Sequence, residues 1–380
     1  DAARPVAPLV KLPDAALLHA QLGLAHIGLG AYDRARDAFG RAVELAPADS
    51  GALFNLALCQ KQTGDLDGAI ASYGRLHART PEDTDCLYNL AGCYRESGDP
   101  HRAATCYRAV LALDEHHLAA AATLAHLHHG RGEVDQAARW YHHLLARRPG
   151  DEAARYLLDA LTGAHHDNAP ESYVRGLFDS CAASFEQTLV TDLGYDNPAE
   201  LHACLQRCPG HHEHYAHALD LGCGTGLSGL PFAPQVDLLD GVDLSVNMLA
   251  LARDKGCYAT LHTDSISHHL RTTADTYDLF IATDVFIYIG DLRELFAAAA
   301  AAARPGALFC CSTERREAAG FELRATGRFA YSRDYLQDTA AAAGWRVLTV
   351  EPTGLRREGD TRIEGDLWVL RLDTIPVEAG

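Results

Sequence analysis

The sequence predicts an α-helical repeat region followed by an α/β domain with a mostly parallel sheet. Two observations support this expectation. The first half repeats with a period of 34 residues. After residue 217, short apolar strands alternate with helical stretches, and the first strand runs into a glycine-rich turn. Such alternation is typical of βαβ units. A chain of 380 residues is long enough for two domains, each with its own core.

The charge and cysteine content exclude several classes of partner and compartment. The formal net charge is −18, and it is uneven, with −4 over residues 1–164 and −14 over residues 165–380. Such an acidic chain disfavours nucleic acid as the main partner. No apolar run is long enough to cross a membrane. The 11 cysteines contain no C-x-x-C pair, which indicates a reducing compartment, so we expect a cytoplasmic protein.

The repeats are defined by four columns of residues that recur together. Each repeat has a leucine in a predicted first helix, a glycine that ends this helix, and an alanine where the second helix approaches closely. An aromatic residue then fills the space between the helices. In the first repeat we expect Leu22 and Ala25 to face inward. The columns are Leu22, Leu56, Leu90 and Leu124; Gly30, Gly64, Gly98 and Gly132; Ala35, Ala69, Ala103 and Ala137; Phe39, Tyr73, Tyr107 and Tyr141.

This pattern resembles the tetratricopeptide repeat (TPR) over roughly residues 16–151, with 152–162 as a capping helix. The resemblance implies a solenoid with a concave groove that can bind a peptide or protein partner. Asn55 and Asn89 occupy the position where family members bond a peptide backbone. The alternative is that both are ordinary polar residues on a solvated face. A first domain of residues 1–164 is expected to end at a polar, helix-breaking hinge, 165–170.

The second half begins with a helix and a glycine turn. Apolar residues from Val174 to Leu189 recur at helical spacing and predict an amphipathic helix. Residues 165–215 are expected to form a linker with helices. This stretch resembles the helix that covers the ligand in a family of enzymes named below, and the alternative is a helix that packs between the two domains. Residues 217–221 form a predicted strand, and Gly222, Gly224 and Gly226 follow at alternate positions. Alternating glycines let the backbone approach a ligand closely, and Leu227 onward is expected to open a helix.

Further strands are predicted at 236–242, 258–261, 278–283, 307–311, 345–350 and 367–372. Acidic residues stand at or just after the ends of three of the earlier ones, at Asp243, Asp264 and Asp284. A carboxylate at the end of the second strand can accept hydrogen bonds from both ribose hydroxyls. A histidine cluster at 211–217 could suggest a metal, but no ligand spacing is completed, so no metal is expected.

These motifs resemble those of the class I S-adenosyl-L-methionine (SAM) methyltransferases. The resemblance implies a Rossmann-like domain over 216–380, with its last two strands antiparallel. It also implies SAM as cofactor and S-adenosyl-L-homocysteine as product. In the family these positions hold the cofactor, and here they are Asp220, Gly222, Cys223, Gly224, Gly226, Asp243, Leu244, Met248, Asp264, Ser265 and Thr283.

The acceptor is less defined by the sequence. The resemblance makes Asp284 and Tyr288 the candidate catalytic residues, with Glu314 and His262 as weaker ones. Arg328 and Tyr331 lie in a predicted loop, 327–332, where acceptor contacts occur in the family. There is no Asn-Pro-Pro-Tyr motif, which disfavours one route of amino methylation. We expect a peptide or protein acceptor. Two alternatives are a small-molecule acceptor with the repeats used for assembly, and a SAM-binding assembly protein without catalysis. The oligomeric state stays open.

Overall fold

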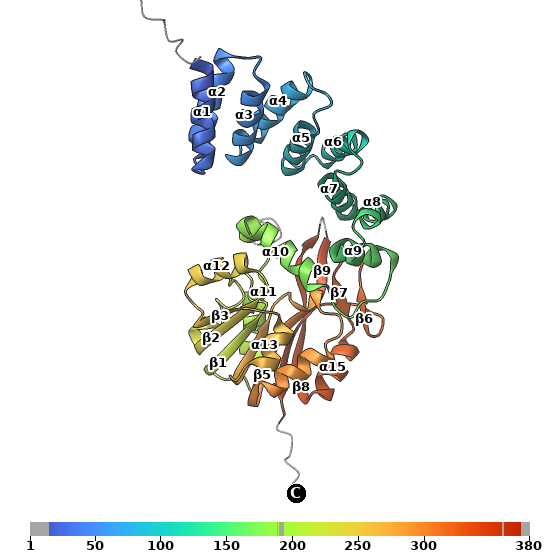
Figure 1. Cartoon of the computed structure of the whole chain (residues 1–380). Helices are drawn as coiled ribbons and strands as arrows, with labels where there is room; N and C mark the ends of the chain where they lie inside the picture. The colour runs from blue at the N-terminus through green and yellow to red at the C-terminus, as the bar shows by residue number, and fades with distance from the viewer. Residues whose placement is uncertain (1–14, 188, 190–193, 359–360, 374–380) are drawn as a thin grey trace, which may run out of the picture. The chain divides into compact units, whose positions relative to one another are not determined.

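The structure is a computed structural model that describes residues 15–187, 189, 194–358 and 361–373 (Figure 1). The chain divides into two compact units, residues 1–149 and residues 150–380. The first unit is helical. The second contains the sheet. No helix in the described part of the chain is long and apolar enough to cross a membrane.

The described part of the first unit, from residue 15 on, consists of four helix pairs, as the 34-residue period predicts. The glycine between the two helices of each pair has a positive φ, between 68° and 82°, a conformation that glycine adopts without strain. The alanine and aromatic columns are buried, with at most 1% of any side chain exposed. The helices are α1 (Ala15–Gly28), α2 (Tyr32–Leu45), α3 (Ser50–Gln62), α4 (Leu66–His77), α5 (Thr84–Glu96), α6 (Pro100–Leu113), α7 (Leu118–Gly130) and α8 (Val134–Arg147).

The expectation for the first leucine is wrong. Leu22 is 49% exposed and Ala25 is also exposed, whereas Leu90 and Leu124 are buried. The reason is position in the array. The later leucines have a preceding helix pair to pack against, and among the described residues α1 has none.

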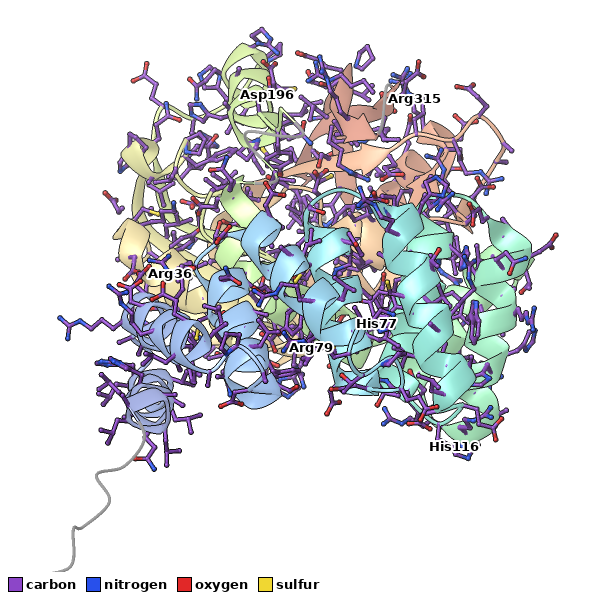
Figure 2. All side chains as sticks on the ribbon, turned by 90° about the horizontal axis from the view of Figure 1, so that it is seen from above. Arg36, His77, Arg79, His116, Asp196 and Arg315 are labelled. Atoms are coloured by element: carbon purple, nitrogen blue, oxygen red, sulfur yellow. The ribbon has the colours of Figure 1, made fainter. Side chains whose placement is uncertain are left out.

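Capping and side-chain contacts hold the helix pairs in register. The carboxylates of Asp49 and Asp83 accept hydrogen bonds from Ala52 N and Cys86 N at the starts of α3 and α5. Successive pairs are also joined, because Arg79 Nη1 donates to the Pro47 carbonyl at 2.8 Å (Figure 2). The repeated sequence thus encodes repeated local contacts.

The second unit contains a seven-stranded sheet in the order β3-β2-β1-β4-β5-β9-β8. Strands β1 to β5 are parallel and β9 and β8 form an antiparallel edge, as expected. The strands are β1 (Tyr215–Leu221), β2 (Val236–Asp243), β3 (Thr260–Thr263), β4 (Tyr277–Ala282), β5 (Ala303–Glu314), β6 (Phe321–Leu323), β7 (Phe329–Tyr331), β8 (Trp345–Glu358) and β9 (Thr361–Leu372).

Among the described residues of this unit, seven α-helices accompany the strands. They are α9 (Glu152–Thr162), α10 (Glu171–Glu186), α11 (Asn197–Arg207), α12 (Val246–Lys255), α13 (Ile266–Thr272), α14 (Arg293–Ala301) and α15 (Arg333–Ala342). Short 3₁₀ turns lie at η2 (Ala233–Gln235) and η3 (Phe286–Tyr288). Helix α11 contributes Leu201 and Leu205 to the core of the sheet.

Two local predictions are wrong. No helix follows the glycine turn, where the chain continues through turns to η2. Gly229, Pro231 and Pro234 explain this, because glycine and proline disfavour a helix interior. The expected loop 327–332 is partly a strand, since β7 pairs with β6 in a separate two-stranded sheet.

Segment 165–170 connects α9 and α10 without a helix and is hydrogen-bonded to the loop after β4. Asn168 forms an antiparallel bridge with Ile289. Ala169 N donates to the Tyr288 carbonyl at 2.9 Å, and Asp291 N donates to the Asp167 carbonyl at 2.8 Å. The predicted hinge is therefore packed against the end of the sheet.

Candidate active site

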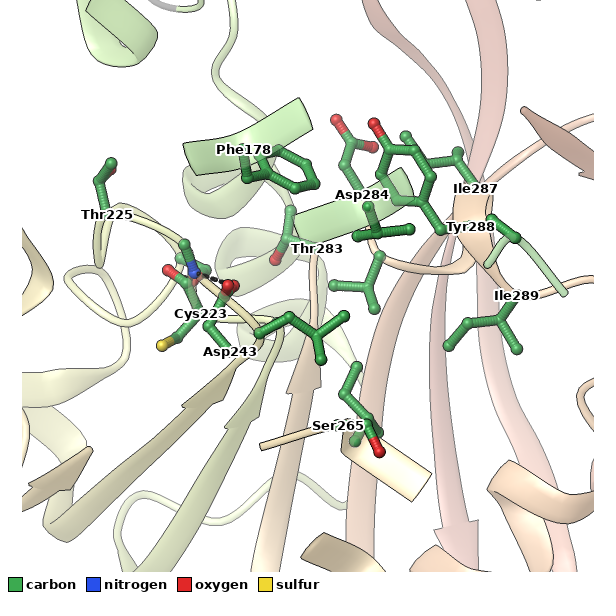
Figure 3. Close-up of a pocket in the computed structure, with 18 of the residues that line it drawn as sticks. Phe178, Cys223, Thr225, Asp243, Ser265, Thr283, Asp284, Ile287, Tyr288 and Ile289 are labelled. Carbon is green, nitrogen blue, oxygen red and sulfur yellow. Dashed lines mark hydrogen bonds between the residues drawn. The ribbon is translucent and has the colours of Figure 1, made fainter. Parts of the chain in front are cut away.

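The candidate site is a cavity of about 280 Å³ at the carboxyl ends of β1, β2 and β4 (Figure 3). Ligands of open α/β sheets bind at this edge. Helix α10 supplies an apolar wall through Val174 and Phe178. Of the predicted site residues, the pocket brings together Gly222, Cys223, Gly224, Asp243, Leu244, Asp264, Ser265, Thr283, Asp284, Tyr288 and Arg328.

The glycine turn forms one end of the pocket. Gly222 has φ 68°, and a Cβ there would lie 2.8 Å from Val285 Cγ2. Gly224 has φ 53°, and no atom lies within 4 Å of where its Cβ would be, so this side of the turn is open for a ligand. Gly226 does not line the pocket. Its Cβ would meet Tyr258 at 3.0 Å and the Ala252 Cα at 3.2 Å, so this glycine allows close packing.

Asp243 ties the glycine turn to the end of β2. Its carboxylate accepts hydrogen bonds from Gly224 N at 3.0 Å and Ser245 N at 2.8 Å (Figure 3). Burial raises the pKa of Asp243, and these two hydrogen bonds act against that rise. Ser245 caps α12, because its Oγ accepts from Met248 N at 3.1 Å. Asp243 is thus free of the capping role and faces the pocket.

Asp264 and Ser265 bring the end of β3 to the same pocket. Asp264 accepts from Ser265 N at 2.8 Å and contacts His268 Nδ1 at 2.6 Å. Partial burial acts to raise the pKa of Asp264, but the hydrogen bonds from His268 and Ser265 outweigh it and the pKa is lowered. Asp264 is therefore an ionised carboxylate at neutral pH.

Asp220 and Met248, two predicted cofactor contacts, do not line the pocket. Asp220 is fully buried behind the turn, where one carboxylate oxygen accepts from Ser228 Oγ at 2.6 Å and Tyr258 OH at 2.7 Å. Burial raises its pKa to about 7, against the effect of these two hydrogen bonds. Met248 is buried in α12.

The opposite end of the pocket is built around Asp284, which has a positive φ of 57°. Its main-chain N donates to Ser312 Oγ at 2.8 Å. Asn197 Nδ2 lies 3.2 and 3.3 Å from the two carboxylate oxygens, and Arg356 Nη1 lies 3.8 Å from one of them. Burial raises the pKa of Asp284, while Arg356 acts to lower it. A half-buried carboxylate with a positive φ at a strand end is typical of functional sites.

Tyr288 lies beside Asp284 in the pocket (Figure 3). Burial raises the pKa of Tyr288, and the charge of Arg328 together with a hydrogen bond to it acts in the opposite direction. Tyr331 does not line the pocket. Its buried hydroxyl donates to the Phe286 carbonyl at 2.6 Å and also contacts the Ile289 carbonyl, so it fixes the loop that carries Tyr288.

Two residues that line the pocket, Arg356 and Tyr195, are not predicted from the sequence. Arg356 is 4% exposed and Tyr195 is half-buried, and both line the pocket. Arg356 lies in β8 beyond the predicted strand end at 350. It forms an ion pair with Glu314, whose other oxygen lies 3.1 Å from Arg324 Nη1. Glu314 and His262 do not line the pocket. The observed strand β8 ends at Glu358, eight residues beyond the predicted end, and therefore includes Arg356. No pattern in the sequence predicts this extra length.

Two other sets of residues singled out in the sequence, the repeat asparagines and the histidine cluster, are not part of the pocket. Asn55 and Asn89 belong to the first unit. In the described part of the chain, no three His, Cys, Asp or Glu side chains are arranged to hold a metal. His214 and His217, from the predicted cluster, instead contact Asp237 and Asp240, each at 2.7 Å.

The pocket fits SAM by its donor and acceptor groups. Thr283 Oγ1 is buried at the end of β4 without a hydrogen-bond partner. Asp243 and Asp264 offer carboxylates at the ends of adjacent strands, and Gly224 leaves open space beside the turn. A nucleoside with two ribose hydroxyls and an amino acid tail satisfies such a set of groups.

Known family models match parts of both halves of the chain. A family described as "Methyltransferase domain" matches residues 218–306. Two tetratricopeptide repeat families match residues 21–84 and 94–161. The first match spans the glycine turn and all the acidic strand ends described above. The other two cover most of α1 to α4 and most of α6 to α9, and leave most of α5 between them.

Curated relatives match only part of the chain. A ubiquinone biosynthesis O-methyltransferase of Hydrogenovibrio crunogenus is 29% identical over 102 residues, which is 26% of this chain and 42% of the relative. One from Bordetella bronchiseptica is 28% identical over 152 residues, which is 36% of this chain and 63% of the relative. The chain thus spans less than two thirds of the length of these relatives.

Solved structures resemble each half at low identity. A SAM-dependent methyltransferase from Clostridium acetobutylicum is 17% identical with a TM-score of 0.39, over 50% of this chain and 98% of that one. The crystal structure of MamA is 19% identical with a TM-score of 0.35, over 36% of this chain and 80% of that one. The family matches place a tetratricopeptide repeat region N-terminal to a methyltransferase domain in this chain.

Proposed function

We propose that the chain transfers the methyl group of SAM to a hydroxyl oxygen of a small acceptor bound beside Asp284 and Tyr288. The observation that supports this best is the pairing of a half-buried carboxylate and a phenol beside apolar walls of the pocket. Val174, Phe178 and Ile287 line that end. The curated relatives are named as O-methyltransferases, which favours oxygen as the receiving atom.

The protein's role in such a reaction is alignment and exclusion of water. SAM supplies an activated methyl group, so no further activation of the donor is required. The apolar walls from α10 hold the acceptor and keep water out. Tyr288, supported by Arg328, orients the acceptor hydroxyl. Asp284 accepts the proton that this hydroxyl loses as its oxygen is methylated.

The contacts of Asp284 suit this role as a general base. Asn197 and Ser312 fix the carboxylate in place, and Arg356 offsets part of the penalty of burying its charge. The raised pKa makes Asp284 a stronger base than an exposed carboxylate. Because only the ionised form accepts a proton, kcat/KM should rise with pH through the pKa of Asp284, at a pH above the ~4 of an ordinary aspartate.

The test is transfer of labelled methyl from SAM into a panel of small phenols, including catechol, with a cell extract fractionated by size in parallel. Asp284→Asn should lower kcat by roughly 10²- to 10⁴-fold and remove the rising pH limb. Asp254→Asn, at an exposed position of α12, is the control and should behave as wild type. An Asp284→Asn variant with full activity and the same pH profile would exclude Asp284 as the base.

A second candidate is a peptide or protein acceptor recruited by the repeats. Asn55 and Asn89 occupy equivalent positions, are half-buried, and each donates to the carbonyl four residues earlier, at 2.9 and 2.8 Å. Their identical arrangement in adjacent repeats suits recognition of a regular peptide backbone. The double change of Asn55 and Asn89 to Ala separates the two candidates. It should raise KM for a peptide acceptor and leave methylation of a small phenol unchanged.

A further inference from the structure

We propose that Tyr156 of helix α9 is a positioning residue for the acceptor end of the pocket, acting through the turn that carries Arg328. This proposal rests on the proposed function, because it concerns the same pocket. It assigns a role in acceptor binding to the helix that directly follows the four repeats, far in sequence from every strand end of the site.

The primary contact is a buried hydrogen bond across 171 residues of chain. Tyr156 is fully buried, and its hydroxyl donates to the Gly327 carbonyl at 3.0 Å. Gly327 has φ 75°, and a Cβ there would lie 3.0 Å from Leu157 Cδ2. Two neighbouring residues of α9 therefore hold this glycine, one by a hydrogen bond and one by packing.

The turn held by Tyr156 leads straight to the pocket. Gly327 N donates to the Arg324 carbonyl and Arg324 N donates to the Arg328 carbonyl, both at 2.9 Å. Arg324 is anchored in turn by Glu314, at 3.1 Å. The residue after Gly327 is Arg328, which lines the pocket together with Tyr288 and whose charge acts to lower the pKa of that phenol. A displacement of the Gly327 carbonyl is thus passed to Arg328 within one residue.

The ring of Tyr156 also contacts the start of the apolar wall. Its centroid lies 5.1 Å from the Tyr173 ring, and Tyr173 belongs to α10. Val174 and Phe178 of the same helix line the pocket. The Tyr156 ring also lies edge-on to His166, with centroids 5.3 Å apart. Tyr156 therefore touches both structures that enclose the acceptor end, the Arg328 turn and α10.

The family comparison relates helix α9 to the repeats. The repeat family that matches residues 94–161 includes nearly all of α9, yet α9 lies in the second compact unit. One helix is therefore both the continuation of the repeats in sequence and a support of the acceptor pocket. We infer that acceptor binding depends on α9 in a way that cofactor binding does not.

Tyr156→Phe in the full chain tests this, because it keeps the ring contacts and removes only the hydrogen bond. We expect KM for the catechol probe to rise about 3- to 10-fold, the loss of one hydrogen bond, with the Kd for SAM unchanged. Tyr277→Phe is the matched control. Tyr277 is equally buried, its hydroxyl lies 3.5 Å from His269, and it does not line the pocket. This control should leave KM unchanged.

A second measurement does not require an acceptor. In the full chain with ¹⁵N-labelled arginine and bound S-adenosyl-L-homocysteine, the Nε–H signal of Arg328 is assigned by its loss in Arg328→Lys. Tyr156→Phe should shift or broaden this signal, and Tyr277→Phe should not.

An unchanged Arg328 signal in Tyr156→Phe overturns the proposal, as does an unchanged KM. If wild type binds SAM but methylates none of the acceptors, the proposed function fails while the arginine signal still decides the role of Tyr156.

Discussion

Asp243 connects the glycine turn, the end of β2 and the pocket through a single carboxylate. Its bonds to Gly224 N and Ser245 N fix the turn, and the same side chain faces the space where ribose hydroxyls are expected. We expect this half-buried carboxylate to be sensitive to removal, because we propose that the two oxygens that hold the turn also bind the cofactor.

Asp243→Ala should weaken SAM binding by roughly ten- to a hundredfold, since hydrogen bonds to a charged group contribute ~1.5–3 kcal/mol. Calorimetry with SAM measures the change. Asp237→Ala is the control, because Asp237 is exposed at the other end of the same strand. Equal affinity in wild type and Asp243→Ala would remove Asp243 from the cofactor site.

Asp220 makes stability depend on pH. Its pKa is raised to about 7 in the folded protein by burial, whereas an unfolded aspartate titrates near ~4. The folded state therefore binds the proton more tightly. The stabilisation from this group is fully present below the unfolded pKa and is lost as pH rises through about 7.

Asp220→Asn cannot ionise, so it should gain stability relative to wild type as pH rises from 5 to 8. The slope of the difference should be at most ~1.4 kcal/mol per pH unit. Urea unfolding of both proteins at several pH values gives this slope. A difference that is constant over the range would mean that Asp220 is already ionised in the folded protein.

At the scale of one element, two glycines in the turn after β1 are needed for different reasons. Gly222 and Gly224 both have positive φ, but only Gly222 has a neighbour where a Cβ would stand, Val285 at 2.8 Å. A change to alanine therefore strains the backbone at both positions and causes a clash at only one of them.

We expect Gly222→Ala to lower the melting temperature more than Gly224→Ala, because both carry the cost of positive φ and only the first must displace Val285. Gly224→Ala should instead act mainly on SAM affinity, since its new methyl group occupies pocket space. Thermal unfolding and calorimetry of the pair give both quantities. Equal loss of stability with equal affinity would contradict this division.

At the scale of the whole molecule, the position of α9 bears on where the chain can be cut. The sequence places a boundary near residue 164, at the polar segment after α9. The compact units instead meet at 149 and 150, with α9 in the second. The Tyr156 bond to Gly327 is the kind of contact that a cut at 164 would break.

A fragment of residues 150–380 should therefore be more stable than one of residues 165–380, because it keeps the buried Tyr156 and Leu157. Melting temperatures of the two fragments, with SAM calorimetry on each, test this. The finding that both fragments melt at the same temperature and bind SAM equally would show that α9 adds nothing to the second unit.

The sequence by itself determines the repeats and the cofactor end of the pocket. The repeats follow from local chemistry, as positive-φ glycines and buried aromatic residues recur every 34 positions. The cofactor end follows from topology, because carboxyl ends of neighbouring parallel strands meet at one edge and bring Gly224, Asp243 and Asp264 together.

Only the tertiary structure decides the acceptor end. Arg356, Tyr195 and Tyr156 come from an extended edge strand, a segment between helices and the helix after the repeats. Their encounter with Asp284 or the Arg328 turn depends on contacts between residues far apart in the chain. The periodicity of the sequence does not predict such long-range contacts. The same reason moves Asp220 out of the pocket, since its bond to Tyr258 forms only when the turn packs against the segment between α12 and β3.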